Sequence, residues 1–420
     1  MAATNSTARF GKYALVDRLA VGGMAEIFLA REESGSGPAR TIVLKRIRPH
    51  LTKVSSFVKM FLNEARLAAQ LNHPNIVQIH DLGKVADSYY IAMEYISGRD
   101  MRRVIPRAAE MGIAFPLVYA LKIASSVCQG LSYAHQKTDL AGSPLELVHR
   151  DITPENILVS FDGGVKILDF GIAKASNQVE QTRAGEIKGK LSYMSPEQAS
   201  GLPLDARSDL FSLGVVLYEW LTGYRLFKGE SEVAVLKTIS EGRIHAPSYF
   251  RPEIPDEVER IVMRALEKDR DRRYQTAWEF QQDLDRYLAQ SEFTPSNLHL
   301  SNFLRQLFFD ELEVEKARQG EEKSGPETDE QALDLAELAE EVKAAEARAR
   351  ENAAAVAEKP WEEGQGDEQS AEPEPRGTEQ LLALPLAAGE LKKLGQIATL
   401  HQTTPEALVR EILSSWLKYR

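Results

Sequence analysis

The chain has 420 residues, of which 43% are apolar, with a net charge of −11 and a single cysteine, Cys128. This length exceeds one ordinary domain, so we expect a folded unit of about 250–300 residues and a further segment. One cysteine excludes an internal disulfide framework and fits a reducing compartment. Residues 1–9 lack the apolar core of a signal peptide, and the longest apolar stretch, 213–221, is too short to span a bilayer. We therefore expect a soluble cytoplasmic protein with no membrane partner.

The first part of the chain predicts a small sheet that carries one helix. Patterns typical of strands occur at 14–19, 26–31, 41–47, 77–82 and 89–95. Helical periodicity occupies 56–71, before the last two of these strands.

The second part predicts a larger, helical lobe. Helical periodicity dominates from 116 to about 290, with short strand-like pieces at 157–160 and 165–168. A further amphipathic helix is expected at 298–309.

An acidic segment follows the helical part. Residues 311–380 hold 22 acidic and 8 basic side chains, so the negative charge of the chain belongs mainly to this segment. Ala, Glu, Lys, Gln and Pro dominate residues 311–377 and aromatic side chains are almost absent. Such a composition buries little, so we expect a disordered linker or a lone solvated helix.

Small residues interrupt the strand pattern near the start of the chain. The sequence there is LAVGGMAEI (19–27), whose backbone amides could approach phosphate oxygens. Taken alone, two glycines between strands more often form a simple hairpin. Lys45 ends the apolar run 42–44, and Glu64 lies in the helix that follows. Each of these charges, considered alone, is more often a solvated surface group.

Three short motifs occur in a fixed order further along the chain. They are HRDITPEN (149–156), DFG (169–171) and SPE (195–197). Their joint occurrence by chance is far less probable than that of any one. A phosphoryl-transfer enzyme must hold a polyphosphate, bind a metal and orient an attacking hydroxyl, and these motifs supply carboxylates and an amide for those tasks.

With these motifs, residues 13–288 resemble the bacterial eukaryotic-type (Hanks-type) Ser/Thr protein kinases, most of all the myxobacterial members. The resemblance implies an α+β, two-lobed protein-kinase fold, with a small β-rich N-lobe carrying one helix and a larger helical C-lobe. It implies transfer of the γ-phosphoryl of ATP to protein Ser or Thr hydroxyls. The expected segments are a disordered N-terminus (1–12), the kinase domain (13–290), a helical extension (291–310), the acidic linker (311–377) and a small C-terminal module (378–420).

The resemblance also implies roles for individual residues. Lys45, positioned by Glu64, would hold the α- and β-phosphates of ATP. Asp151 would orient the substrate hydroxyl and take its proton late in the reaction. Asn156 and Asp169 would ligate Mg²⁺.

An ATP pocket between the lobes is implied as well. Met93 would be the gatekeeper, residues 94–96 the hinge that pairs with adenine, and Asp100 would reach the ribose. The residues expected to line the pocket are Leu19, Ala20, Val21, Gly22, Gly23, Ile27, Val43, Lys45, Met93, Glu94, Ile96, Asp100 and Leu158.

Three further residues are implied to brace the site. Glu197 would pair with Arg273, and Asp209 would support the catalytic loop. Arg150 resembles the arginine of kinases whose activation segment is ordered by a bound phosphate. The candidate acceptors of that phosphate, by autophosphorylation, are Ser176, Thr182 and Ser192, of which Thr182 is favoured.

The sequence departs from the family pattern at several positions. Alanine replaces glycine of the loop at Ala20 and Ala25, and Val43 replaces an alanine. Thr153 stands where the family has a lysine that contacts the γ-phosphate, and Lys190 stands where it has the threonine partner of that lysine. Two interpretations stay open. Either the pair survives with its members exchanged, so that Lys190 acts at the γ-phosphate, or Lys190 points to solvent.

The last residues, 378–420, have the strand-helix-helix outline of a ribbon-helix-helix unit, which forms as a dimer. Its strand candidate, 378–386, contains no Lys or Arg, so we do not expect binding of nucleic acid. Self-association or a plain helical hairpin remain as alternatives.

The sequence is compatible with three functions. The leading one is an active Ser/Thr kinase that acts on protein substrates. The alternative is a pseudokinase scaffold that binds nucleotide or a partner without catalysis, which rests on Thr153 and the loop alanines. The third, a DNA-binding regulator, would need a basic face that residues 378–420 do not offer.

Overall fold

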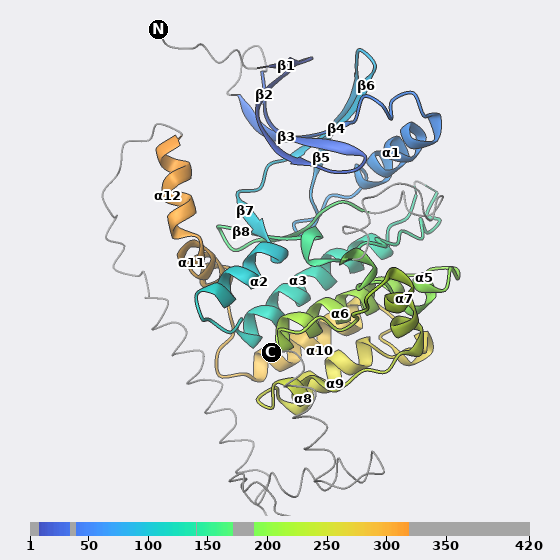
Figure 1. Cartoon of the computed structure of the whole chain (residues 1–420), viewed down its shortest axis with the longest axis vertical. Coiled ribbons are helices and arrows are strands. Elements are labelled where there is room, and N and C mark those ends of the chain that lie inside the picture. Colours follow the sequence, from blue (N-terminus) through green and yellow to red (C-terminus); the bar gives the residue numbers. More distant parts are fainter. Residues whose placement is uncertain (1–7, 34–38, 140, 171–188, 319–420) are drawn as a thin grey trace, which may run out of the picture. The chain divides into compact units, whose positions relative to one another are not determined.

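The computed structural model of the chain describes residues 8–33, 39–139, 141–170 and 189–318. These residues belong to the first of two compact units, Met1–Lys359, and the second unit is Pro360–Arg420. The described part has a small lobe built on a β-sheet and a larger lobe of helices (Figure 1). This arrangement confirms the expected α+β, two-lobed fold.

The small lobe is an antiparallel sheet crossed by one helix. Its strands are β1 (Arg9–Phe10), β2 (Tyr13–Val21), β3 (Ala25–Glu32), β4 (Arg40–Ile47), β5 (Ile79–Val85) and β6 (Ser88–Glu94), in the order β1-β2-β3-β4-β6-β5. In β4, Ile42 and Leu44 are buried in the core of one face. Because successive side chains of a strand alternate between faces, Val43 and Lys45 lie on the other face, together with Ile47. Ile47 packs with α1 (Ser55–Ala68).

The predicted elements of this lobe form, with shifts of a few residues at their ends. The helix expected at 56–71 ends at Ala68. Beyond it, Gln70 N and Leu71 N donate to carbonyls three residues back, at 3.1 Å and 3.0 Å. This tighter turn closes the helix before its sequence pattern stops.

The large lobe is helical. Its α-helices are α2 (Met101–Glu110), α3 (Leu117–His135), α5 (Pro196–Ala199), α6 (Arg207–Thr222), α7 (Glu232–Glu241), α8 (Pro247–Phe250), α9 (Asp256–Ala265), α10 (Ala277–Gln290), α11 (Asn297–Leu307) and α12 (Phe309–Arg318), and its 3₁₀ turns are η1 (Pro154–Asn156) and η3 (Arg270–Arg272). Among the residues with a described structure, no helix combines the length and the apolar character that crossing a membrane requires.

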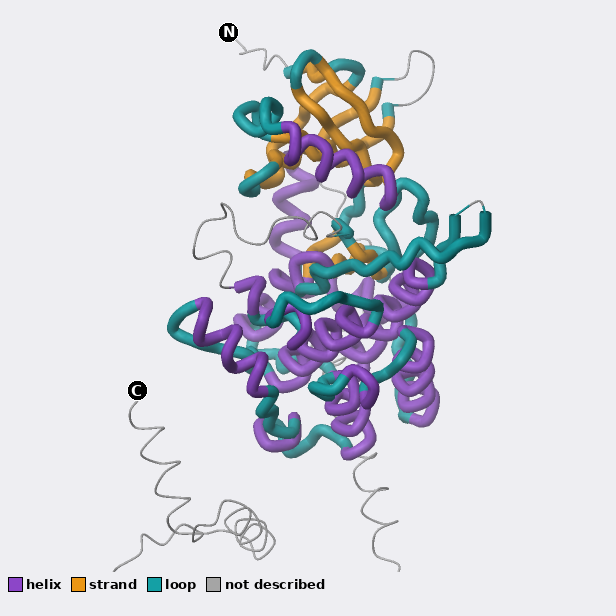
Figure 2. Tube along the Cα trace, turned by 90° about the vertical axis from the view of Figure 1, so that its right-hand side faces the viewer, coloured by secondary structure: helices purple, strands orange, loops and turns teal. Residues whose placement is uncertain are grey.

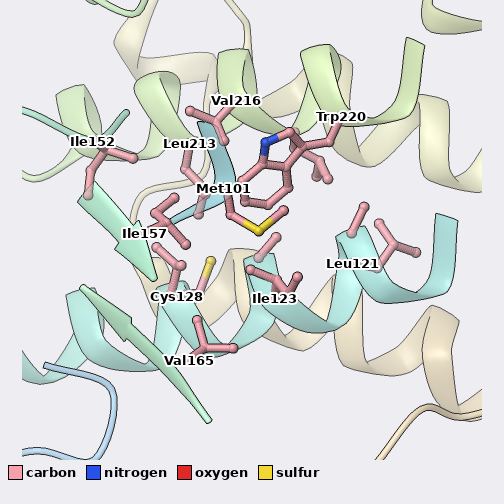
Figure 3. Packing of buried hydrophobic residues seen from close by; sticks show 14 of the residues in the cluster. Met101, Leu121, Ile123, Cys128, Ile152, Ile157, Val165, Leu213, Val216 and Trp220 are labelled. Atoms are coloured by element: carbon pink, nitrogen blue, oxygen red, sulfur yellow. The ribbon is translucent and has the colours of Figure 1, made fainter. Parts of the chain in front are cut away.

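Two helices, α3 and α6, form the centre of the large lobe. Most residues of both helices are buried, as expected for helices that are apolar on nearly all sides. Figure 3 shows their side chains meeting around Met101 of α2. The residues labelled there from the two helices are Leu121, Ile123, Cys128, Leu213, Val216 and Trp220, and Ile157 and Val165 come from two short strands. At its end, α6 turns through Gly223, whose φ of 75° favours glycine.

A short sheet lies where the lobes meet (Figure 2). It consists of β7 (Gly98–Asp100), β8 (Ile157–Ser160) and β9 (Val165–Ile167), in that order. Ile167 N donates to Asn75 O at 2.9 Å, and Val77 N donates to Ile167 O at 3.0 Å. These bonds join β9 to the segment that leads into β5, so the sheet connects the two lobes.

The chain continues in an ordered form past the expected domain end. Helix α11 matches the helix predicted at 298–309 within two residues. The expected start of the linker, residue 311, falls inside α12. The rest of the expected linker beyond Arg318, and the expected module at 378–420, lie outside the described residues.

Candidate active site

A buried carboxylate at the start of α6 holds the segment His149-Arg150-Asp151. Asp209 is 1% exposed and accepts hydrogen bonds from His149 N (2.7 Å) and Arg150 N (2.8 Å). Its Oδ2 also lies 2.9 Å from Nε2 of His135. These donors offset the cost of burying a charge. The prediction that Asp209 supports this loop is confirmed.

Two residues of the site adopt a backbone conformation that side chains rarely take. Arg150 has a φ of 66° and Asp169 a φ of 42°. His149 connects the two segments that hold them: its Nδ1 accepts from Asp151 N (3.2 Å), and its Nε2 lies 2.9 Å from Leu168 O. Because a carbonyl oxygen only accepts, Nε2 is the donor in this bond. Strained residues that are fixed by such contacts are typical of functional sites.

Asp151 and Asn156 are joined directly. Asn156 Nδ2 donates to Asp151 O (2.7 Å) and to Asp151 Oδ2 (3.0 Å), and the turn η1 between them sets this approach. With Nδ2 engaged, Oδ1 is the atom of Asn156 that suits a cation. Leu168 N donates to Asn156 O at 2.9 Å, which links this pair to the residue before Asp169.

Lys45 bridges the two lobes through its ammonium group. Its Nζ lies 3.4 Å from Glu64 Oε1 of α1 and 3.0 Å from Asp169 Oδ1. Burial opposes the charge on Lys45, but the two carboxylates outweigh it and hold the Lys45 pKa above its ordinary value. Burial also raises the pKa of Glu64, although the nearby charge of Lys45 lowers it in part. Lys45 is therefore a fixed cation in a site of low solvent exposure.

Oxygen atoms of Asp169 and Asn156 suit Mg²⁺ as ligands. Asp169 offers a carboxylate and Asn156 an amide oxygen, both hard ligands. Within the described ranges, no group of three or more His, Cys, Asp or Glu side chains converges as a complete metal cage. Mg²⁺ commonly completes its shell with water and phosphate oxygens, so the donors present fit this ion.

The residues expected around adenine lie along the two sheets. In the small sheet Ala20 pairs with Ile27, and Val43 pairs with Met93. Gly22 N donates to Ala25 O at 2.9 Å and closes the turn between β2 and β3. Before this turn, the side chains of Leu19 and Val21 are exposed, by 48% and 45%.

The expected hinge and ribose positions lie next to the short sheet. Asp100 pairs with Leu158 across β7 and β8. Its Oδ1 accepts from Arg103 N (3.1 Å), so Asp100 also caps α2. Glu94 Oε1 accepts from Gln78 N (2.7 Å) and lies 2.6 Å from Lys166 Nζ, which fixes the start of the segment 94–96.

Lys190 faces Asp151. Its Nζ lies 3.9 Å from Asp151 Oδ2 and 3.5 Å from Glu155 Oε2, while 40% of its side chain remains exposed. Thr153 is 2% exposed, and its Oγ1 has no hydrogen-bond partner among the described residues. The contact between Lys190 and Asp151 that the exchange hypothesis requires is present.

The segment after Lys190 is anchored by a buried ion pair. Glu197 and Arg273 form two parallel hydrogen bonds of 2.8 Å and 2.9 Å, and Ser208 Oγ donates to Glu197 at 2.6 Å. The predicted pairing of Glu197 with Arg273 is confirmed. Ser192 is 2% exposed, which makes it a poor phosphate acceptor in this conformation. Ser176 and Thr182 lie outside the described residues.

The motifs did not indicate two of the contacts at the site. Arg102 of α2 forms a close ion pair with Glu155. Gln198 Nε2 donates to Arg150 O at 3.0 Å and connects α5 to the catalytic loop. Both contacts depend on how distant segments pack, so no local pattern could reveal them.

Comparison with known proteins identifies the family of the chain. The family profile of the protein kinase domain matches residues 13–284. The chain belongs to the protein kinase family. It is 44% identical over 309 residues to the tyrosine-protein kinase MasK of Myxococcus xanthus, covering 74% of this chain and 48% of MasK. It is 40% identical over 283 residues to the serine/threonine-protein kinase PknB of Mycobacterium leprae, covering 66% of this chain and 43% of PknB.

Solved kinase structures resemble it too. The kinase domain of PknI from Mycobacterium tuberculosis superposes with a TM-score of 0.51 at 26% identity, covering 68% of this chain and 99% of the PknI chain. The kinase resemblance expected from the motifs is thereby confirmed. The chain spans about half the length of the curated relatives it matches. The similarity to MasK covers a larger share of the chain than residues 13–284, so it extends outside the kinase domain.

Proposed function

We propose that the chain is a protein kinase that transfers the γ-phosphoryl of ATP to Ser or Thr hydroxyls of proteins. One continuous set of contacts carries this proposal. Lys45 Nζ lies 3.0 Å from Asp169 Oδ1, and Asn156 Nδ2 lies 3.0 Å from Asp151 Oδ2. The backbone bond from Leu168 N to Asn156 O (2.9 Å) joins the two pairs. These contacts link a cation suited to phosphate, oxygen ligands suited to Mg²⁺ and a carboxylate suited to act as a base, which are the groups that phosphoryl transfer requires.

Each residue has a task in this proposal. Lys45 binds and orients the polyphosphate of the substrate, and Glu64 keeps its ammonium in place. Asp151 accepts a hydrogen bond from the attacking hydroxyl and receives its proton late in the transfer. Asn156 and Asp169 hold Mg²⁺, which, when bound, neutralises the charge of the phosphoryl oxygens. Of the pocket residues named above, Leu19, Ile27 and Leu158 hold the adenine ring and Asp100 reaches the ribose.

Lys190 has a task in this proposal as well. Its Nζ is within ion-pair distance of Asp151 Oδ2, 3.9 Å, so it can reach a phosphoryl group that Asp151 faces. We propose that it supplies the charge that a lysine at the position of Thr153 supplies in the family pattern. Preorganised cations of this kind stabilise a phosphoryl-transfer transition state.

The class of acceptor hydroxyl is supported by the relatives. PknB and the PrkC protein of Bacillus subtilis, 35% identical over 274 residues, are named serine/threonine-protein kinases. MasK is named a tyrosine-protein kinase. Because these relatives differ in the acceptor that their names give, the transfer assay should also identify the residue that receives the phosphate.

Regulation through a phosphate is the further part of this proposal. Arg150 Nε is buried and has no hydrogen-bond partner among the described residues. A buried donor without a partner is costly, and a phosphate on the activation segment would satisfy it. Thr182 remains the favoured acceptor by position.

The experiment that tests the proposal is a transfer assay with γ-labelled ATP, Mg²⁺ and a generic acceptor protein. We expect the wild-type chain to label the acceptor. Asp169→Ala should lower the rate at least about 10²-fold, because it removes a metal ligand at the reacting phosphates. Asp87→Ala, at a side chain that is 99% exposed, is the matched control and should retain the wild-type rate. A wild-type chain that transfers no label, or an Asp169→Ala variant as fast as wild type, would refute the proposal.

A further inference from the structure

Helix α12 supplies carboxylates to two arginines of the large lobe. Glu311 Oε2 accepts from Arg99 Nη2 (2.9 Å), Arg99 Nε (3.2 Å) and Arg103 Nη2 (2.8 Å). Glu315 Oε1 accepts from Arg99 Nη2 at 2.7 Å. Residues four apart share one face of a helix, so Glu311 and Glu315 face these arginines together. Figure 1 shows α11 and α12 following the large lobe on the side of α2.

Arg99 needs these counter-charges. Its side chain is 9% exposed, and its guanidinium lies over the rings of Phe161 (5.1 Å) and Phe308 (5.4 Å). Its Nη1 also donates to Gly98 O at 3.0 Å. A cation buried against aromatic rings is stable only when anions neutralise it. Removing Glu311 would leave Arg99 with Glu315 as its remaining carboxylate partner among the described residues.

Helix α11 fixes the other end of this assembly against the strand β8. Ser301 Oγ (2.6 Å) and Arg305 Nε (2.9 Å) both donate to Phe161 O, one residue after β8 ends. Gly163 has a φ of 83°, and a Cβ there would lie only 1.8 Å from Asn297 O. Arg107 Nε donates to Leu307 O at 3.0 Å, which secures the end of α11 on α2. The position of α12 is thus set by close contacts on both sides.

The two arginines flank the residue proposed to bind ribose. Arg99 precedes Asp100 in β7, and the backbone N–H of Arg103 donates to Asp100 Oδ1 at 3.1 Å. Across the short sheet, Arg99 pairs with Val159 and Asp100 with Leu158, the expected floor of the adenine site. A change in the position of either arginine therefore shifts the backbone next to Asp100.

We propose that α12 is part of the nucleotide site, with Glu311 as a positioning residue. Through Arg99 and Arg103 it holds β7 and the first turn of α2 in the conformation that directs Asp100 at the ribose hydroxyls of bound ATP. This inference rests on the proposed function, because it assumes that nucleotide binds in the cleft. It extends the site beyond the kinase-domain match, which ends at residue 284.

The test is calorimetric titration of the full chain with Mg²⁺-ATP and with Mg²⁺-2′,3′-dideoxy-ATP, which lacks both ribose hydroxyls. Wild type should prefer ATP by about tenfold, the value of a hydrogen bond to a charged group. Glu311→Lys should weaken ATP binding by about fivefold and leave dideoxy-ATP binding unchanged, so that most of the preference disappears. Asp87→Lys, which makes the same change of charge at a carboxylate that is 99% exposed, is the control and should behave as wild type.

A melting curve of each variant establishes that it is folded. Should Glu311→Lys not fold, Glu311→Gln replaces it, and a smaller loss of the ATP preference is expected. The inference is overturned if the Glu311 variants keep the wild-type preference, or if they weaken ATP and dideoxy-ATP equally, since equal weakening indicates a general structural effect. It is also overturned if wild type binds both nucleotides equally. Binding of neither nucleotide by wild type would instead overturn the proposed function itself.

Discussion

We expect Asp151→Asn to lower the rate of phosphoryl transfer by about 10²–10⁴-fold, the usual contribution of a positioned base, and to leave ATP affinity close to that of wild type. The amide keeps the size of the carboxylate and can still accept the hydrogen bond from Asn156 Nδ2, which is 3.0 Å long in the native site. It cannot take the proton of the attacking hydroxyl. Chemistry is therefore lost while the fold and the binding of ATP are retained.

This expectation is measured by single-turnover transfer from labelled ATP and by calorimetric titration with Mg²⁺-ATP. Asp87→Asn, at an exposed carboxylate of the small lobe, is the matched control. An Asp151→Asn variant whose transfer rate is within a factor of a few of wild type would show that Asp151 is not the base. Parallel loss of ATP binding would indicate that the substitution damages the cleft.

We expect Lys190→Ala to lower the transfer rate by about 10²-fold, the size of effect that follows when one preorganised electrostatic group is removed from an active site. The reason is the position of its ammonium, 3.9 Å from Asp151 Oδ2, beside a buried Thr153 that supplies no charge. The affinity for ATP should change little, because Lys45 and the pocket residues remain. The measurement is kcat and KM for ATP with a protein acceptor.

The double exchange Thr153→Lys with Lys190→Thr provides a second arm, since it places both residue types where the family pattern has them. It should recover most of the rate that Lys190→Ala loses. Lys237→Ala, at a lysine whose side chain is 76% exposed, is the control. An undiminished rate for Lys190→Ala would mean that Lys190 serves only as a surface charge, which is the interpretation that the sequence left open.

The sequence predicted the fold well because the signals of its elements are local. Alternation in 41–47 and periodicity in 56–71 indicate a strand and a helix regardless of the rest of the chain. The spacing within HRDITPEN and DFG places Asp151, Asn156 and Asp169 by short loops alone. What the structure adds is the distances that join Lys45 and Asp169 across the lobes.

The sequence did not predict that residues 311–318 lie in a helix bound to the large lobe. Their acidic composition favoured a solvated linker, because charged residues bury little by themselves. Glu311 is ordered by Arg99 and Arg103, which lie about 200 positions earlier in the chain. Such a partnership has no local signature. The burial of Ser192 is similar: its sequence suggests an accessible acceptor, and only tertiary packing removes it from solvent.

The most direct test of the central claim is mass-spectrometric mapping of phosphate after the full chain and an acceptor protein are incubated with Mg²⁺-ATP. The account predicts phosphate on Ser or Thr side chains in the wild-type reaction and none in the Asp151→Asn reaction. Phosphate confined to Tyr would keep the kinase and correct the acceptor class. Absence of phosphate from both proteins in the wild-type reaction would contradict the claim that Asp151 and Asp169 act together on one bound nucleotide.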